Sequence, residues 1–268
     1  MTKSQTEHPR VVSQAEWLAA RKDLLTKEKN FTRQRDAVSA ERRQLPWVKV
    51  EKEYVFDGPN GKETLADLFD GRSQLVVYHF MFGPGWEEGC RSCSFLADHI
   101  DGSVVHLAHR DVTFVVISRA PLAKIDAFKK RMGWRFKWVS SYGNDFNRDY
   151  HVSFTKDDIA KGKTYYNYEV RESTSEGEAP GTSVFYKDAT GDIFHTYSSY
   201  ARGGDMLIGA YNYLDLVPKG RDEDALAFTM AWVRHHDRYG DDYFVDPLAP
   251  YLPPKGSDSC CGAGEDHS

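Results

Sequence analysis

The chain has 268 residues, of which 40% are hydrophobic and 28% charged, as in an ordinary globular protein. A formal net charge of -5 without any basic block gives no reason to expect nucleic acid as a partner. No apolar run approaches the ~20 residues that cross a bilayer, and the first ten residues lack the apolar stretch of a secretion signal. The composition therefore predicts a cytoplasmic protein without a membrane partner.

Residues 1–45 are expected to form a loose arm followed by one long helix. Ser13 and Glu16 have the spacing of a capping box, in which two side chains satisfy free N–H groups at a helix start. The helix should end before Pro46, and its apolar residues form only a thin stripe. A surface helix is the simpler interpretation, and a helix that mediates homo-oligomerisation is the alternative.

Residues 46–245 are expected to form a domain in which strands and helices alternate. A strand is expected at 47–56, and the nearly continuous apolar run at 74–82 is typical of a buried central strand. The elements expected next are a helix from Cys90 towards Ile100, a strand at 112–118, a helix at 121–132 and a strand at 136–140. This alternation predicts an α/β fold with a central mixed sheet flanked by helices.

The second half of this domain shows weaker patterns. Residues 141–180 are polar and rich in tyrosine, and they predict an insertion with short elements. Segments 182–187 and 192–198 flank a turn and predict a β-hairpin. Residues 225–239 have the apolar spacing of a helix.

Residues 246–268 are expected to form a flexible tail, because proline, glycine and polar residues accumulate there. The tail contains the adjacent pair Cys260 and Cys261. A flexible segment of about 20 residues spans roughly 25 Å, which is enough to return to Cys90. One hypothesis is that the tail relays electrons to or from that cysteine, and the alternative is that its thiols are incidental.

The four cysteines occur in two tight pairs, Cys90 with Cys93 and Cys260 with Cys261. A secreted disulfide scaffold would be smaller and denser in cysteine. In a chain of this kind such pairs indicate redox chemistry or metal binding.

The Cys90-Arg91-Ser92-Cys93 motif follows a buried strand and a Gly/Pro loop, at an expected helix start. Cysteines three apart on a helix share one face and are close enough for a disulfide. Helix-start N–H groups stabilise a thiolate and lower a cysteine pKa from ~8.5 to roughly 3.5–7.5. Arg91 adds positive charge, and nearby exposed carboxylates oppose it by only ~1 kcal/mol. We therefore expect Cys90 to be the nucleophile and Cys93 the resolving thiol.

Other interpretations of the dithiol stay open. A structural zinc site needs two further ligands, and the tail cysteines lack the usual spacer. No cofactor is therefore expected, and the alternative is copper held by Cys90, Cys93 and a histidine such as His195 or His79. The two cysteines could also be inert core residues.

Two histidines are candidates for supporting roles. His79 lies in the expected buried strand just before the dithiol loop, either as a satisfied core residue or as a proton shuttle. His195 lies on the expected hairpin, either as a paired polar group or as a catalytic one.

Several segments resemble thioredoxin-like proteins. Residues 75–98 resemble the active-site strand, loop and helix of that superfamily, and residues 112–134 resemble the next strand and helix of its peroxiredoxin-type members. Over residues 10–245 the chain is similar to a bacterial thioredoxin-like family catalogued as domain of unknown function 899. The segments that carry this resemblance are 80–86, 180–186, 194–198 and 211–215. The resemblance implies a thioredoxin-like fold and no particular activity.

The sequence departs from thioredoxin at three points. Thioredoxins carry tryptophan directly before the first cysteine, whereas here Gly89 has that position and Trp86 lies three residues earlier. Arg91 and Ser92 replace the usual Gly-Pro dipeptide. The resemblance also implies a cis-proline facing the dithiol, for which Pro180 is the nearest candidate. These differences concern the residues that tune redox potential and partner choice.

The sequence thus predicts a thiol–disulfide oxidoreductase that uses Cys90 and Cys93, with a protein or small-molecule thiol or disulfide as substrate. The first alternative is a copper- or other metal-binding protein of the same fold. The second is a non-catalytic module whose aromatic pocket binds a small molecule.

Overall fold

The computed structural model describes residues 9–172 and 177–240, and every structural statement below concerns these residues. The chain divides into two compact units, residues 1–48 and 49–268. The boundary falls within β1 (Val48–Lys49).

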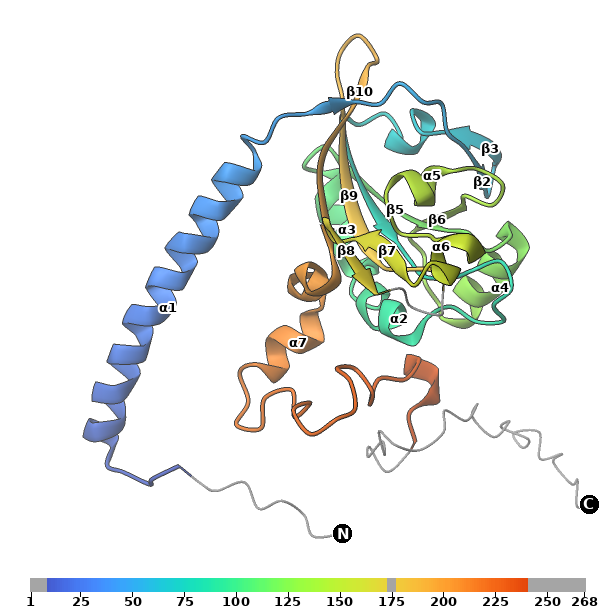
Figure 1. The fold of residues 1–268 in the computed structure, drawn as a ribbon. Helices are drawn as coiled ribbons and strands as arrows, with labels where there is room; N and C mark the ends of the chain where they lie inside the picture. Colours follow the sequence, from blue (N-terminus) through green and yellow to red (C-terminus); the bar gives the residue numbers. More distant parts are fainter. Residues whose placement is uncertain (1–8, 173–176, 241–268) are drawn as a thin grey trace, which may run out of the picture. The chain divides into compact units, whose positions relative to one another are not determined.

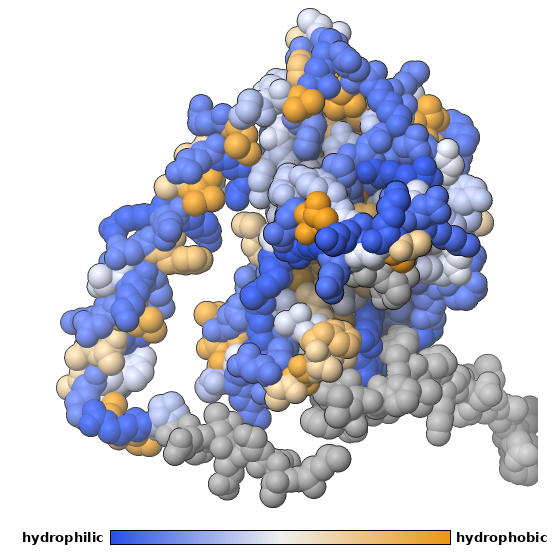
Figure 2. All heavy atoms as spheres, viewed as in Figure 1, coloured by the Kyte–Doolittle hydropathy of each residue, from blue (hydrophilic) through white to orange (hydrophobic). Residues whose placement is uncertain are grey.

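The first unit contains one long helix, α1 (Gln14–Arg42), drawn in blue in Figure 1. The predicted capping box is confirmed, since Ser13 Oγ accepts from the Glu16 N–H at 3.3 Å and Glu16 Oε2 accepts from the Ser13 N–H at 3.1 Å. No residue of α1 is buried. Hydrophobic side chains alternate with hydrophilic ones along its surface (Figure 2). None of the described helices, α1 included, is long and apolar enough to cross a membrane.

The second unit is built on a sheet of eight strands in the order β1-β10-β9-β4-β5-β6-β2-β3 (Figure 1). Its strands after β1 are β2 (Val55–Gly58), β3 (Gly61–Thr64), β4 (Gln74–His79), β5 (Val112–Ser118), β6 (Lys137–Ser140), β9 (Gly181–Lys187) and β10 (Ile193–Tyr200). Strands β4, β5 and β6 are parallel, whereas β9 is antiparallel to both β4 and β10. The sheet is therefore mixed, as the sequence predicts.

Alternation along β4 divides the buried side chains between the two faces of the sheet. Leu75 and Val77 pack on one face, which η1 (Asp67–Phe69) and α5 (Phe146–Asp149) cover. Tyr78 belongs to the other face and its larger aromatic cluster. The helices that pack against this cluster are α2 (Arg91–Ala97), α3 (Asp101–Ala108), α4 (Leu122–Arg131) and α7 (Gly209–Leu214). Full burial of each large apolar side chain stabilises the fold by about 1.5–3 kcal/mol.

The order of elements defines the class of fold. Strand β4 leads through a loop into α2, and β5 then returns parallel to β4. Helix α4 connects β5 to the parallel strand β6, and the hairpin β9–β10 completes the centre of the sheet on the other side of β4. This is a thioredoxin-like α/β fold, which confirms the predicted fold class.

The short elements expected at 141–180 are present. They are α5, α6 (Lys156–Ala160) and a separate two-stranded sheet of β7 (Lys163–Tyr166) and β8 (Glu169–Glu172). The strand expected at 47–56 is interrupted, because only β1 and the beginning of β2 are paired there. The helix expected from Cys90 to Ile100 ends at Ala97, and α3 follows it.

The helix predicted at 225–239 is wrong. The segment forms turns and one short 3-10 helix, η3 (His236–Arg238), and Met230 has a φ of 66° that an α-helix does not tolerate. Glu223 Oε1 accepts hydrogen bonds from the Met230 N–H at 3.0 Å and from Trp232 Nε1 at 2.6 Å. These tertiary contacts outweigh the local helical pattern, which is a weak preference.

Candidate functional site

Cys90 and Cys93 lie at the start of α2, as the sequence predicts. Cys90 is the residue that caps the helix, with φ -57° and ψ 130°, and α2 begins at the next residue. Both cysteines are free thiols. Cys90 is half-buried, whereas only 2% of Cys93 is exposed. The first thiol is therefore partly accessible to solvent, and the second is enclosed in the protein interior.

Hydrogen bonds to the backbone and close packing fix the loop between β4 and α2. The Cys90 N–H donates to the Met81 carbonyl oxygen at 3.0 Å, and Ser94 Oγ donates to the Cys90 carbonyl oxygen at 2.9 Å. Gly89 leaves no room for a side chain, because a Cβ there would lie 2.6 Å from Phe80 and 2.7 Å from Phe128. This close packing explains why glycine stands where thioredoxins carry tryptophan.

The Cys93 thiol is surrounded by hydrogen-bonding groups. Its Sγ accepts from the Met81 N–H at 3.5 Å and also contacts the hydroxyl of Tyr78 and the thiol of Cys90. Burial raises the pKa of Cys93 well above its usual value, and Cys90 raises it further, while Tyr78 and Met81 act in the opposite direction. Burial also raises the pKa of Tyr78, so its phenol stays a hydrogen-bond donor. Cys93 is therefore protonated when the site is reduced.

Both cysteines line a pocket of about 90 Å³. Its wall combines side chains of β4 and α2 with residues from the β9–β10 region, η2 (Ala201–Leu207) and Met230. Asp205 is the charged residue in the lining, and its carboxylate is bound by Arg221 at 2.8 Å and Arg202 at 3.4 Å. The pocket is thus small and close to neutral.

Pro180 lies directly before β9 and lines the same pocket. Its preceding peptide bond is trans, so the cis-proline that the resemblance implies is absent at this position. The trans form is the ordinary preference of an X–Pro bond, by ≈ 0.5–1 kcal/mol. Tyr166 fixes this wall, because its hydroxyl donates to the Pro180 carbonyl oxygen at 2.7 Å and accepts from the Ala201 N–H at 2.9 Å.

Trp86 and Arg91 flank the dithiol in sequence. Trp86 packs against the aromatic cluster on the helix side of the sheet, and its carbonyl oxygen accepts from Lys124 Nζ at 2.9 Å. The Arg91 guanidinium lies 5.8 Å from the ring centroid of Phe228, a cation–π distance. The same Lys124 pairs with Glu87 at 3.1 Å, which screens one of the carboxylates near the thiols.

His79 and His195 lie apart from the dithiol pocket, since neither lines it. They are joined by a buried chain of hydrogen bonds in which His79 Nε2 meets Ser183 Oγ, Ser183 Oγ meets Ser198 Oγ, and Ser198 Oγ meets His195 Nε2, each at 2.8 Å. Burial lowers the pKa of His79 to about 3 and also lowers that of His195. The structure thus places His79 as a neutral core residue, and His195 pairs with a serine.

The residues named for the copper alternative do not form a metal-binding group in the described part of the chain. In the part of the chain that the structure describes, no three His, Cys, Asp or Glu side chains are grouped so that they could hold a metal ion. His195 instead bonds to Ser198, as above. Cys260 and Cys261 lie outside the described residues, so the tail relay stays a prediction.

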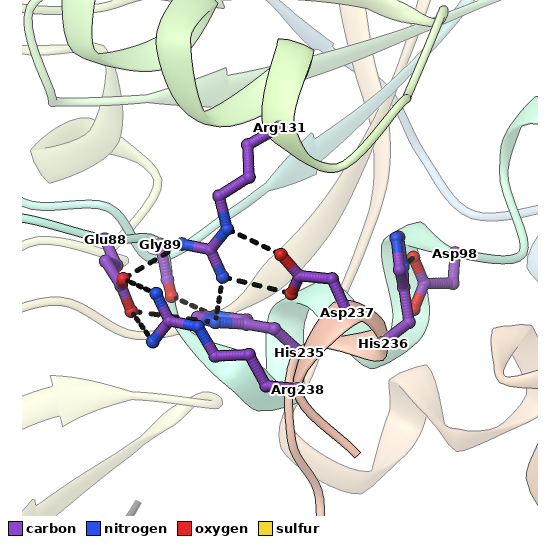
Figure 3. A network of polar contacts seen from close by, with 8 residues as sticks. All are labelled: Glu88, Gly89, Asp98, Arg131, His235, His236, Asp237 and Arg238. Carbon is purple, nitrogen blue, oxygen red and sulfur yellow. Dashed lines mark hydrogen bonds and ion pairs between the residues drawn. The ribbon is translucent and has the colours of Figure 1, made fainter. Parts of the chain in front are cut away.

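A polar network beside the dithiol was not anticipated from the sequence. It joins Glu88, Arg131 and the segment 235–238, which comes from the irregular region after α7 (Figure 3). Its members are far apart in sequence, with a separation of 146 residues between Gly89 and His235. No local pattern could have indicated it. Tyr78 was also missed, although a tyrosine in the buried strand before the loop was a usable signal.

The order of the elements and the topology of the sheet define a thioredoxin-like fold. The model of a bacterial family described as a protein of unknown function, DUF899, matches residues 6–239. The chain belongs to this family, which confirms the resemblance found in its sequence. No protein with a curated description matches it.

Several solved structures are similar to the chain at low identity and with TM-scores of 0.40 or less. Peroxidoxin BcpB from Mycobacterium tuberculosis is 13% identical, with a TM-score of 0.40, and the match covers 62% of this chain and 94% of that one. Peroxiredoxin Q from Xanthomonas campestris is 13% identical in one of its structures, with a TM-score of 0.37 and coverage of 58% and 87%. A putative protein disulfide isomerase from Bacteroides thetaiotaomicron is 18% identical, with a TM-score of 0.33 and coverage of 63% and 91%.

Proposed function

We propose that this protein is a thiol–disulfide oxidoreductase in which Cys90 is the nucleophile and Cys93 the resolving thiol. The observation that carries the proposal is the pairing of a half-buried thiol at a helix start with a buried thiol in contact with it, both at the wall of one pocket. A thiolate at such a position is stabilised by helix-start N–H groups.

In the first step the Cys90 thiolate attacks one sulfur of a substrate disulfide. A bond forms between that sulfur and Cys90 Sγ, and the other half of the substrate leaves as a thiolate. In the second step Cys93, after losing its proton to the departing thiolate, attacks Cys90 Sγ. The second half of the substrate leaves, an internal disulfide forms, and two electrons have passed from the protein to the substrate.

The surroundings of Cys93 suit the second step. A buried thiol with a raised pKa is a poor nucleophile until its negative charge is stabilised. The Tyr78 hydroxyl and the Met81 N–H both point hydrogen-bond donors at Cys93 Sγ. These two donors support the thiolate at the moment when it must form.

The pocket favours a small substrate or the narrow end of a larger one. Its volume of about 90 Å³ exceeds the roughly 10–15 Å³ that one buried water needs, but it is well below the ≈ 300–1,000 Å³ of a typical pocket for a drug-sized ligand. The reducing cytoplasm that the sequence predicts would keep the dithiol reduced.

The test is disulfide turnover by the reduced full-length protein with hydroxyethyl disulfide and with insulin. Cys90→Ser should abolish turnover, and Cys93→Ser should trap a mixed disulfide on Cys90 that mass spectrometry detects. The double variant Cys260→Ser/Cys261→Ser separates the core dithiol from the tail. If reduced wild-type protein transfers no electrons to either substrate, and the oxidised protein accepts none from dithiothreitol, the proposal is wrong.

Two measurements distinguish the other interpretations. Metal analysis of protein purified under reducing conditions would reveal copper or zinc held by the thiols. The midpoint potential of the Cys90–Cys93 couple indicates whether the protein gives electrons to its substrate or takes them from it. A value near the cytosolic poise fits a reductase, and a much higher value fits an oxidant.

A further inference from the structure

The peptide group between Gly89 and Cys90 is held on both of its polar sides. Its N–H, which belongs to Cys90, donates to the Met81 carbonyl oxygen at 3.0 Å. Its carbonyl oxygen, which belongs to Gly89, contacts Nε2 of His235 at 2.9 Å. The orientation of this peptide decides where the Cys90 side chain leaves the backbone.

The tautomer of His235 follows from its other neighbour. Arg131 NH2 lies 3.1 Å from His235 Nδ1, and a guanidinium can only donate. Nδ1 therefore accepts, the ring proton resides on Nε2, and Nε2 donates to the Gly89 carbonyl oxygen. His235 is 2% exposed, and its ring centroid lies 5.2 Å from that of Phe128, so packing also fixes its position.

Ion pairs hold Arg131 in the position that this tautomer requires. Figure 3 shows its guanidinium between two carboxylates. Asp237 accepts from Arg131 Nε at 2.8 Å and from NH2 at 3.1 Å, and Glu88 accepts from NH1 at 2.9 Å. Arg238 donates to the same Glu88 carboxylate from the other side. The network thus connects the chain after α7 to the residue pair directly before the nucleophile.

We infer that His235 is a positioning residue for Cys90: by donating to the Gly89 carbonyl oxygen, it fixes the peptide from which the nucleophilic thiol projects. The role of Cys90 as nucleophile rests on the proposed function. The effect of His235 on the reactivity of the Cys90 thiol does not depend on that function, because this reactivity can be measured without any substrate disulfide.

The test is the rate at which iodoacetamide alkylates Cys90 in the full chain, followed by peptide mass spectrometry between pH 5 and 10. His235→Phe retains a ring against Phe128 but removes the donor. We expect at least tenfold slower alkylation at pH 7 and an upward shift of the thiol's titration midpoint by about one pH unit. His235→Gln places an amide donor near the Nε2 position and should restore the rate to within threefold of wild type.

The neighbouring substitution His236→Gln is the matched control, because His236 is half-exposed and bonds to Asp98 instead. If a folded His235→Phe protein has the alkylation profile of wild type, the inference is wrong. If the Phe and Gln variants are equally impaired, packing rather than the hydrogen bond is responsible, and the inference is again wrong. Should His235→Phe fail to fold, Arg131→Gln tests the same bond, and an unchanged profile there would count against it equally.

Helix α1 carries a stripe of exposed apolar side chains. Four of its large apolar side chains recur every seven residues and are 47–68% exposed; they are Trp17, Leu24, Phe31 and Val38. Residues seven apart lie on one face of a helix, so these four form a stripe. In an antiparallel pair of such helices, Trp17 would oppose Val38, and Leu24 would oppose Phe31. In the same register, Lys27 of each helix lies opposite Glu28 of the other helix.

We propose that the partner of this stripe is α1 of a second copy of the chain, in that antiparallel register. Each apolar residue then meets an apolar partner, and Lys27 of each helix faces Glu28 of the other, a carboxylate that also pairs with Arg21 of its own helix at 2.8 Å. Light scattering after gel filtration should give twice the 30.6 kDa mass of the chain. Leu24→Glu/Phe31→Glu should give the monomer mass, whereas Thr26→Glu/Arg33→Glu on the opposite face should leave the dimer intact.

Charge exchange tests the register itself. Glu28→Lys should weaken the dimer about tenfold, because two like-charged pairs then face each other, and Lys27→Glu/Glu28→Lys should restore it. A wild-type monomer at 100 μM would overturn the proposal. So would a dimer that the double exchange weakens as much as the single substitution does.

Discussion

The hydroxyl of Tyr78 lies against the thiol of Cys93, and both residues line the dithiol pocket. Both groups are buried, and both resist losing a proton because burial raises their pKa values. Tyr78 therefore donates to the sulfur and stabilises negative charge on it. The arrangement gives the buried thiol a partner for the step in which it must become a nucleophile.

Replacing Tyr78 with Phe should slow the second step of disulfide exchange and leave the first step nearly unchanged. A hydrogen bond to a charged group contributes about 1.5–3 kcal/mol, which corresponds to roughly 10- to 150-fold in rate. The mixed disulfide on Cys90 should accumulate, and rapid acid quenching with mass spectrometry would detect it. Tyr54→Phe is the control, because Tyr54 packs on the other face of the sheet. Equal decay of the mixed disulfide in wild type and Tyr78→Phe would contradict the prediction.

Replacing Gly89 with Ala should destabilise the fold and lower the reactivity of Cys90. The added Cβ would lie 2.6 Å from Phe80 and 2.7 Å from Phe128, and these ring atoms belong to the packed core. Overpacking of this kind costs about 1–3 kcal/mol, measurable by urea unfolding. Gly85→Ala is the matched control, because a Cβ there meets no atom within 4 Å. A Gly89→Ala protein as stable as Gly85→Ala would show that the loop can move away without loss.

Glu223 accepts the hydrogen bonds that hold together the irregular segment containing His235. Its carboxylate oxygen Oε1 accepts from Tyr211 at 2.8 Å, in addition to the bonds from Met230 and Trp232. Glu223→Ala leaves the buried Tyr211 hydroxyl and the two partly buried donors without their acceptor, and it should reduce the free energy of unfolding by about 3 kcal/mol. Hydrogen exchange should also show faster opening of residues 223–238 than in the control Asp224→Ala, whose side chain is exposed. Exchange unchanged in Glu223→Ala would mean that other contacts hold this segment.

The sequence predicted the part of the site that local chemistry determines. A buried apolar strand, a Gly/Pro loop and the Cys90–Cys93 spacing were enough to place the dithiol at a helix start, because each feature constrains its immediate neighbours. The contact between His235 and Gly89 could not be predicted in this way, since it depends on how two distant segments fold together. The helix expected at 225–239 failed for the same reason: its apolar spacing serves contacts to Glu223 and the aromatic cluster rather than one helical face.

The stability of the fold should depend on pH through His79. Burial lowers its pKa in the folded protein from 6.5 to about 3, so between these two values the unfolded chain binds a proton that the folded protein does not. The free energy of unfolding therefore falls as pH decreases from 6.5 towards 3, by about 1.4 kcal/mol per pH unit for this one residue. His195 and His235, whose pKa values are also lowered by burial, add to the same trend.

Substituting His79 with Gln should remove one such contribution, so that the plot of unfolding free energy against pH becomes shallower between pH 4 and 6. Glutamine can still bond to Ser183, which keeps the comparison at nearly constant packing. Ser183→Ala is the control: it removes the partner but keeps the buried imidazole, so it should lower stability at every pH without changing the slope. Urea unfolding at half-unit pH intervals measures both slopes. Parallel curves for wild type and His79→Gln would mean that His79 takes up its proton without unfolding, contrary to its burial against the rings of Phe146 and Tyr150.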